Sequence, residues 1–282
     1  MGWQHDIGTA NKMIPKANRI PRHSQTTYIP WRWAMLGSCM GLLMALVFFL
    51  PAAWLGLIVE QVSGERVVLN EAQGKIWNGS AQLVLSGGKG SRDAMALPGR
   101  IYWRLRPSLP LKMKLDVHAD CCTQQAFQIF ISPHLTGFSA NILPSQSQWP
   151  ASLMSGLGAP FNTIGLQAAM HLNTQVITLS WLKQQFKFEG QAELDIIDAS
   201  TRLSTAKPIG SYRVNLSGGT IPKINVQTLN GSLQLTGTGE FTGNRWRFRG
   251  EATAATGSEA ALNNFLDILG KRVGPRSLIT LG

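Results

Sequence analysis

Groups that could do chemistry are few and scattered in this sequence. Residues 87–91, GGKGS, are similar to a phosphate-binding loop, but the lysine is followed by glycine and not by Ser or Thr at the start of a helix. Asp195 and Asp198 precede a loop and are ordinary turn residues. The chain has no GxSxG, no HExxH and no GxGxxG that opens a helix. Because catalysis needs groups that converge on a rigid scaffold, we predict no enzyme and no catalytic residue.

The cysteines and histidines indicate no metal or cofactor site. The three cysteines show no CxxC and no Cys–His spacing of the kind that binds zinc. Cys121 and Cys122 are adjacent, and an adjacent pair can close only a strained ring, so we expect them to alternate inward and outward in a strand. Histidines at three positions have ordinary surface or strand interpretations: His118, His134 and His171. The sequence therefore predicts no cofactor and no metal.

The strongest local cluster of charge is a row of three arginines. Arg245, Arg247 and Arg249 occupy alternate positions, which places all three on one face of a strand. A solvated face and a contact face for a partner both stay open. The formal net charge is +11, but the remaining basic residues are scattered singly, so we expect anionic lipid or protein surfaces and no nucleic acid as partners.

The elements that position these groups begin with a membrane anchor. Residues 34–59 hold no charged residue, and about 20 apolar residues suffice for a helix to cross a bilayer core of roughly 30 Å. Pro51 interrupts the stretch, and tryptophans lie near both of its ends, which suits the two headgroup layers. We predict a transmembrane helix over residues 34–59.

Charge predicts how the anchor is oriented. The flank at residues 1–33 contains five Lys or Arg residues and one acid, Asp6, so it should form a cytoplasmic basic tail, which we expect to be disordered. A cleaved signal peptide is disfavoured, because Pro51 occupies the −3 place before the small pair Ala52 and Ala53. Residues 60–282 should then lie on the far side of the membrane.

Residues 60–282 show the alternating pattern that is typical of antiparallel β-sheet. Asn78-Gly79 and Asn230-Gly231 each separate two alternating runs, which predicts hairpins with type I′ turns and positive φ at the glycines. Both are followed by Ser and then by Gln-Leu, so a duplicated meander and a chance likeness both stay open. Bare sheet edges are a liability, so we expect a curled sheet, as an open barrel or trough with two lobes.

The lobe boundaries follow from proline and from one helical pattern. Residues 133–160 contain four prolines and predict a hinge between a first lobe at 60–132 and a second at 161–282. Leu262, Phe265, Leu266 and Leu269 recur with helical spacing after Ser258, which predicts an amphipathic helix that covers the end of the last sheet or docks a partner. Residues 276–281 fit a final strand.

Glycine and tryptophan spacings also carry a resemblance to a known family. They are Gly74, Trp77 and Gly79 in G-x-x-W-x-G, Trp103, Leu105 and Pro107 in W-x-L-x-P, and then Pro208, Gly210, Tyr212, Gly231, Gly237, Gly239, Phe248, Gly250 and Gly270, the last within a closing segment at 262–272. Through these residues the chain from about residue 55 to 282 resembles the type II secretion system protein N family. We expect the motif residues to be structural or to lie at an interface.

The resemblance implies a role and partners. Members would be single-pass proteins of the Gram-negative inner membrane with a periplasmic domain, and would act without catalysis in the machine that moves folded proteins across the outer membrane. Implied partners are other type II secretion subunits and inner-membrane lipid. A second hypothesis is an anchored periplasmic lipid carrier or bridge with an apolar groove. A groove filled by its own Trp and Leu side chains would favour the first, and a continuous apolar channel the second.

Overall fold

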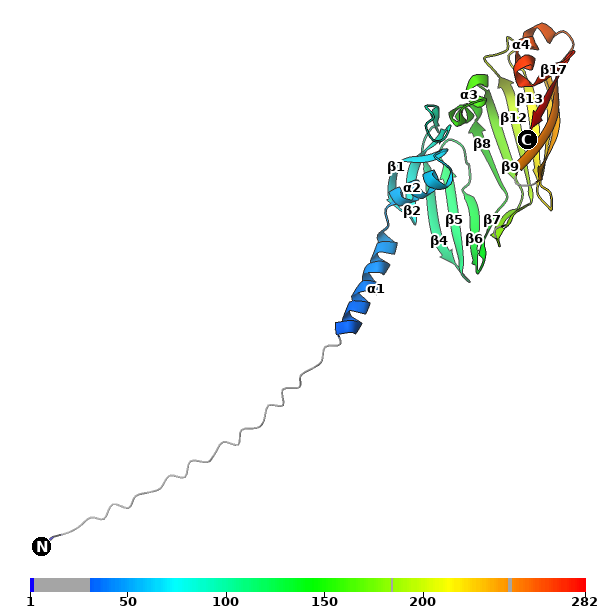
Figure 1. Ribbon diagram of the computed structural model, residues 1–282. Coiled ribbons are helices and arrows are strands. Elements are labelled where there is room, and N and C mark those ends of the chain that lie inside the picture. Colours follow the sequence, from blue (N-terminus) through cyan, green and yellow to red (C-terminus); the bar gives the residue numbers. More distant parts are fainter. Residues whose placement is uncertain (3–30, 184, 243–244) are drawn as a thin grey trace. The chain divides into compact units, whose positions relative to one another are not determined.

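The computed structural model describes residues 1–2, 31–183, 185–242 and 245–282 (Figure 1). Most of the basic tail expected at residues 1–33 lies outside these described residues. The chain divides into two units, Met1–Ala45 and Leu46–Gly282, with the boundary inside the first helix.

The apolar stretch forms two helices instead of the single kinked helix expected over residues 34–59. These are α1 (Trp31–Phe49) and α2 (Ala52–Val62). Pro51 separates them, because proline lacks the N–H that would continue the helix. Its backbone is extended and forms a β-bridge with Lys75. Of the described helices, α1 alone is long and apolar enough to cross a membrane, and none of its residues is buried, whereas α2 buries Ala52 and Gly56.

The first sheet joins antiparallel strands in the order β1-β2-β4-β5-β6-β7-β10-β11, with β3 beside β2. Its strands are β1 (Val67–Lys75), β2 (Asn78–Ser86), β3 (Ala94–Ala96), β4 (Ile101–Ser108), β5 (Lys112–Ala119), β6 (Phe127–His134), β7 (Gly137–Ile142), β10 (Ile177–Leu182) and β11 (Gln185–Glu189). The register aligns Leu115 with Ile129, Ile131 with Ala140 and Leu179 with Phe188. Because side chains alternate along a strand, one face of this sheet is apolar.

The second sheet has the order β17-β18-β16-β15-β14-β13-β12-β9-β8 and is also antiparallel. Its strands are β8 (Ser145–Pro150), β9 (Gln167–Thr174), β12 (Gln191–Ser200), β13 (Gly210–Ser217), β14 (Lys223–Asn230), β15 (Leu233–Thr242), β16 (Arg245–Ala254), β17 (Lys271–Val273) and β18 (Arg276–Leu281). The final strand expected at residues 276–281 is therefore present as β18.

The chain passes between the two sheets several times, which differs from the expected lobes at 60–132 and 161–282. β10 and β11 follow the expected hinge, yet β10 pairs with β7 in the first sheet. The expected hinge at 133–160 is itself structured, with β7, β8 and the 3₁₀ helix η1 (Ala151–Leu157). Its prolines do not prevent pairing, because Pro133 lies near the end of β6 and Pro150 ends the edge strand β8.

Three clusters of buried side chains stabilise the described part of the larger unit. Under α2 lie Ala81 and Trp103, and beside η1 lie Leu97, Ala119 and Leu153. The C-terminal helix α4 (Glu259–Leu269) buries Leu262, Phe265 and Leu266 against the second sheet, together with Tyr212, Leu233 and Ala252. A single helical turn, α3 (Phe161–Ile164), precedes β9.

The predicted mainly β fold with open antiparallel sheets and a C-terminal helix is confirmed. Each sheet has two different end strands, β1 and β11 in the first and β17 and β8 in the second, so neither closes into a barrel. This prediction came from the alternation of apolar and polar residues, because the alternation within each strand does not depend on which strands pair with one another.

Candidate interaction surfaces

The histidines noted in the sequence lie apart and are held by local hydrogen bonds. A 2.8 Å hydrogen bond joins His118 Nδ1 to Thr123 Oγ1, and a 2.9 Å bond joins His134 Nε2 to Ser139 Oγ. His171 Nδ1 lies 3.5 Å from Gln148 Nε2. Among the described residues, no three His, Cys, Asp or Glu side chains come close enough together to hold a metal ion.

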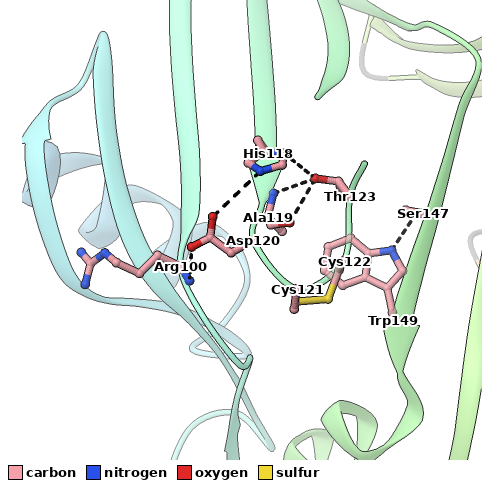
Figure 2. Close-up of a disulfide and its surroundings, with 9 residues drawn as sticks. All are labelled: Arg100, His118, Ala119, Asp120, Cys121, Cys122, Thr123, Ser147 and Trp149. Carbon is pink, nitrogen blue, oxygen red and sulfur yellow. Dashed lines mark hydrogen bonds and ion pairs between the residues drawn. A yellow bond between two sulfur atoms is a disulfide. The ribbon is translucent and has the colours of Figure 1, made fainter. Parts of the chain in front are cut away.

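Cys121 and Cys122 form a disulfide in a turn, which corrects the expectation of a strand with alternating side chains (Figure 2). Cys122 is buried with Leu97 and Leu153, while Cys121 is exposed. Thr123 holds the turn closed, because its hydroxyl accepts a 2.9 Å bond from the Ala119 N–H and its side chain also reaches His118. The tight turn brings the two thiols together, so the ring closes where a strand would have separated them.

A cavity of about 460 Å³ lies beside this disulfide turn. Polar groups from the turn and from three strands of the second sheet line it, among them Gln148, His171 and Asp195. Asp195 accepts two 2.7 Å hydrogen bonds from Arg213, and these lower the pKa of the carboxyl. The same hydrogen bonds raise the pKa of the Arg213 guanidinium. The carboxylate is therefore paired in a structural ion pair and is not free to act as a base.

The first glycine and tryptophan motif packs beside the turn of the β1–β2 hairpin. Gly74 pairs with Gly79 across the hairpin, and Trp103 Nε1 donates a 3.0 Å bond to the Ile76 carbonyl. A Cβ on Gly79 would lie 2.6 Å from Trp103 Cζ2, so glycine there makes room for the indole ring. Pro107 is farther along β4, opposite Met113. The structure thus gathers Gly74, Gly79 and Trp103 but not Pro107.

The turn of this hairpin lies two residues earlier than predicted. Lys75 pairs with Asn78, so Ile76 and Trp77 make the turn, and Gly79 lies inside β2 without a positive φ. The prediction of a type I′ turn at Asn78-Gly79 is therefore wrong. Trp103 packing on Gly79 and the positive φ of 88° at Gly74 fix the register, and tertiary contact outweighs the local turn signal.

The second motif surrounds the β14–β15 hairpin. Here Asn230 ends β14 and Gly231 occupies the turn with a φ of 125°, so positive φ at this glycine is confirmed. Gly231 packs on the backbone of Gly210 so closely that a Cβ would overlap it. Tyr212 is buried, its hydroxyl donates a 3.1 Å bond to the Leu233 carbonyl, and burial raises the pKa of this hydroxyl.

The remaining motif glycines also admit neighbouring groups. Gly237 and Gly239 of β15 face the ring of Phe248 on β16, and a Cβ on Gly239 would lie 2.6 Å from Ile224 Cγ2. Gly270 follows α4 and lies against the Leu278 backbone. These three glycines therefore share close contact with a neighbouring strand, where a Cβ would not fit.

The comparison with protein families gives one match. The model of the family described as type II secretion system (T2SS), protein N matches residues 65–278, which is most of the chain. The chain belongs to the type II secretion system protein N family. It is accordingly a component of the type II secretion system, and other subunits of that system are its implied partners. Neither a curated protein nor a solved structure gives a significant match.

In this protein N family member, the three arginines lie as a row on β16. Arg245, Arg247 and Arg249 alternate along the strand and are exposed, opposite Thr242, Glu240 and Thr238 of β15. Within the described ranges none of them enters an ion pair, while Glu240 lies 3.5 Å from Lys223. The predicted placement of all three arginines on one face of a strand is therefore present in β16.

A larger surface, which the sequence did not reveal, lies on the first sheet. The apolar face continues across β6, β7, β10 and β11, where Phe138, Trp181 and Phe186 are about half exposed. Leu109, Leu111 and Leu135 protrude from two of its hairpin turns. The leucines flanking Pro110, with no acid nearby, were the signal that could have revealed these turns.

Proposed function

We propose that this protein is an inner-membrane subunit of the type II secretion system that acts without catalysis, through surfaces presented in the periplasm. The observation that carries this proposal is the bare helix α1, which buries no residue and precedes the body matched by the family model. An apolar helix with no protein cover needs a lipid environment.

The orientation rests on charge. Residues 1–33 hold Lys and Arg almost without acids, so the basic flank stays cytoplasmic and the sheets lie in the periplasm. A periplasmic location also suits the bonded Cys121 and Cys122, because disulfides persist in oxidising compartments.

The motif residues then divide by role. Gly74, Gly79, Trp103, Gly210, Tyr212, Gly231, Gly237, Gly239 and Gly270 serve packing, as their close backbone and ring contacts indicate. The arginine row on β16 and the apolar face of the first sheet are the contact surfaces for other subunits. Changes in the first set should lower stability, whereas changes in the second should lower secretion at normal protein levels.

An anchor replacement tests this proposal. Residues 1–49 are replaced by a cleavable signal peptide, and secretion of a folded substrate is compared with that of cells carrying the full chain. We expect an exported, released body and reduced secretion. A matched control restores the tether with an unrelated single-pass helix and should recover secretion. Full secretion by the released body would contradict anchoring as part of the role.

A second candidate function is a lipid carrier or bridge. It is favoured by the half-exposed apolar face on β6, β7, β10 and β11, because acyl chains pack on apolar side chains. The cavity next to the disulfide turn is lined by polar groups instead. Lipid that stays bound after detergent purification and is lost on Leu179→Glu would support this candidate; lipid-free protein would count against it.

A further inference from the structure

Hairpin turns of the first sheet gather at one of its ends. Asn78 pairs with Arg104 and the Leu105 N–H bonds to the Trp77 carbonyl, so the β1–β2 turn lies beside Leu105 of β4 and points toward the end where β4 turns into β5. Gly137 pairs with Leu182, so the β6–β7 and β10–β11 turns share an end as well. The antiparallel order of β4, β5 and β6 brings the β4–β5, β6–β7 and β10–β11 turns to one end, and the β1–β2 turn faces the same way but stops short of that end, beside Leu105. Figure 1 shows the β4 and β6 arrows pointing the same way.

The membrane-directed part of the chain joins the larger unit beside this β1–β2 turn. Trp77 Nε1 donates a 2.8 Å bond to the Val47 carbonyl, and the Ile76 N–H donates a 3.0 Å bond to the Leu50 carbonyl. Lys75 Nζ lies 4.2 Å from the centroid of the Phe49 ring. Residues 46–50 are thus fastened to the β1–β2 turn, and the apolar segment leaves the unit there.

The other turns present apolar side chains to their surroundings. Leu109 and Leu111 in the β4–β5 turn are 94% and 87% exposed, and Leu135 in the β6–β7 turn is fully exposed. Trp181 and Phe186, about half exposed, lie one step inside the β10–β11 turn. At a bilayer interface, aliphatic side chains reach the acyl chains while aromatic rings lie at the level of the headgroups. Leucines at the tips with aromatic rings behind them match this arrangement.

The charges at this end have one sign. Lys112 at the start of β5 and Lys183 after β10 are exposed, and Lys187 follows on β11. Residues 74–79, 105–113, 132–139 and 180–188 contain no Asp or Glu. The neighbouring acid Asp116 lies 3.5 Å from Arg106 and 3.3 Å from Lys114, so it is already neutralised. Basic residues without acids are attracted to anionic lipid.

We propose that this end of the first sheet binds the membrane surface. The tip surface is defined as the β4–β5 turn at residues 108–112, the β6–β7 turn at 134–137, and Lys183. Its leucines enter the boundary between headgroups and acyl chains, and its lysines contact anionic phospholipid headgroups. This inference rests on the proposed anchoring, and it adds a second, electrostatic contact with the bilayer to the anchor.

Photo-crosslinking in the full chain tests the tip surface. Benzoylphenylalanine is placed singly at Leu111, Leu135, Leu43 in α1, or Gln124 in the exposed loop at the opposite end of the sheet. The protein is reconstituted into vesicles of phosphatidylcholine, with or without phosphatidylglycerol. We expect lipid adducts from positions 43, 111 and 135, few from 124, and a several-fold gain at 111 and 135 when phosphatidylglycerol is present.

A charge pair sharpens the test. Lys112→Glu with Lys183→Glu should lower the adduct yield at position 111 several-fold, whereas Lys89→Glu with Lys207→Glu, also exposed, should leave it unchanged. Adducts at 43 without adducts at 111 and 135 would overturn the tip surface and leave the anchor intact. Loss of adducts at 43 would remove the anchoring itself. Adducts at 111 to another secretion subunit instead of lipid, in native membranes, would overturn the proposal in favour of a protein contact.

Discussion

The apolar faces of the two sheets differ in how far helices cover them. At one end of the second sheet α4 covers the face and brings Leu262, Phe265 and Leu266 to between 0% and 3% exposure. On the first sheet α2 covers only the part near β1 and β2, and Trp181 and Phe186 stay about half exposed. Burial on the second sheet supplies stability, whereas the first sheet keeps apolar surface available for contact.

Truncating one leucine in each sheet should show the largest difference. Leu266→Ala leaves a cavity under α4 and should lower the free energy of unfolding by about 2–5 kcal/mol. Leu179→Ala, at a partly exposed position on the uncovered face of β10, should cost about 1 kcal/mol, because solvent already reaches this side chain and its truncation leaves no closed cavity. Denaturant unfolding of the full chain in detergent measures both. Equal losses would mean that the first face is covered as well as the second.

Replacing Gly79 or Gly231 by valine should destabilise the protein for different reasons. Gly231→Val meets a positive φ and the Gly210 backbone, while Gly79→Val meets the Trp103 ring, and each should cost about 1–3 kcal/mol. Adding Trp103→Phe should recover about 1 kcal/mol with Gly79→Val and nothing with Gly231→Val. This double-mutant cycle is read from unfolding midpoints. Equal recovery for both glycines would contradict the ring contact.

A tyrosine in each sheet gives a smaller contrast. Tyr212→Phe leaves the Leu233 carbonyl without its buried donor and should lower stability by about 1 kcal/mol. Tyr102→Phe is the matched control in the first sheet, where the side chain is 42% exposed and water can replace any lost bond. Equal shifts in melting temperature for the two variants would show that water can replace the hydrogen bond of the Tyr212 hydroxyl as well.

The ion pair on the second sheet should give the smallest effect, and it depends on pH. Hydrogen bonds from Arg213 lower the pKa of Asp195, so the folded state favours the carboxylate. Its contribution is therefore present above about pH 4, the unfolded value, and is lost as pH falls through the lower folded pKa. Because both side chains stay partly exposed, at 32% for Arg213 and 22% for Asp195, water screens the pair and Asp195→Asn should cost about 1 kcal/mol or less at neutral pH.

Unfolding of Asp195→Asn and the unchanged chain at about pH 6 and about pH 3 separates this contribution. The two proteins should converge in acid. Glu240→Gln, in the exposed pair with Lys223, should change little at either pH. A gap that widens in acid would reverse the sign of the linkage.

Local patterns were enough to predict part of the architecture. Alternation predicted strands on both sides of Gly79 and Gly231, and helical spacing predicted α4, because each signal lies within a few consecutive residues. The arginine row follows from the same period of two. Family membership could also be predicted, since the glycine and tryptophan spacings lie where strands pack closely.

The remaining features depend on contacts between distant residues. Ile76 and Trp77 form the first turn because Trp103 packs on Gly79, and nothing near Asn78 in sequence reveals that. The return of β10 and β11 to the first sheet is likewise a pairing with β7. The disulfide of Cys121 and Cys122 depends on a turn that Thr123 holds by hydrogen bonds. The position of the hairpin turns at one end of the first sheet depends on the order of its strands.

The central claim is that α1 crosses the inner membrane and places both sheets in the periplasm, where they act by contact. Two reporters fused after Gly282 in the full chain test it directly: alkaline phosphatase, active only in the periplasm, and a fluorescent protein that matures only in the cytoplasm. We predict active phosphatase, a dark fluorescent protein, and recovery of both fusions in the inner-membrane fraction. Bright fluorescence with inactive phosphatase would contradict the claim.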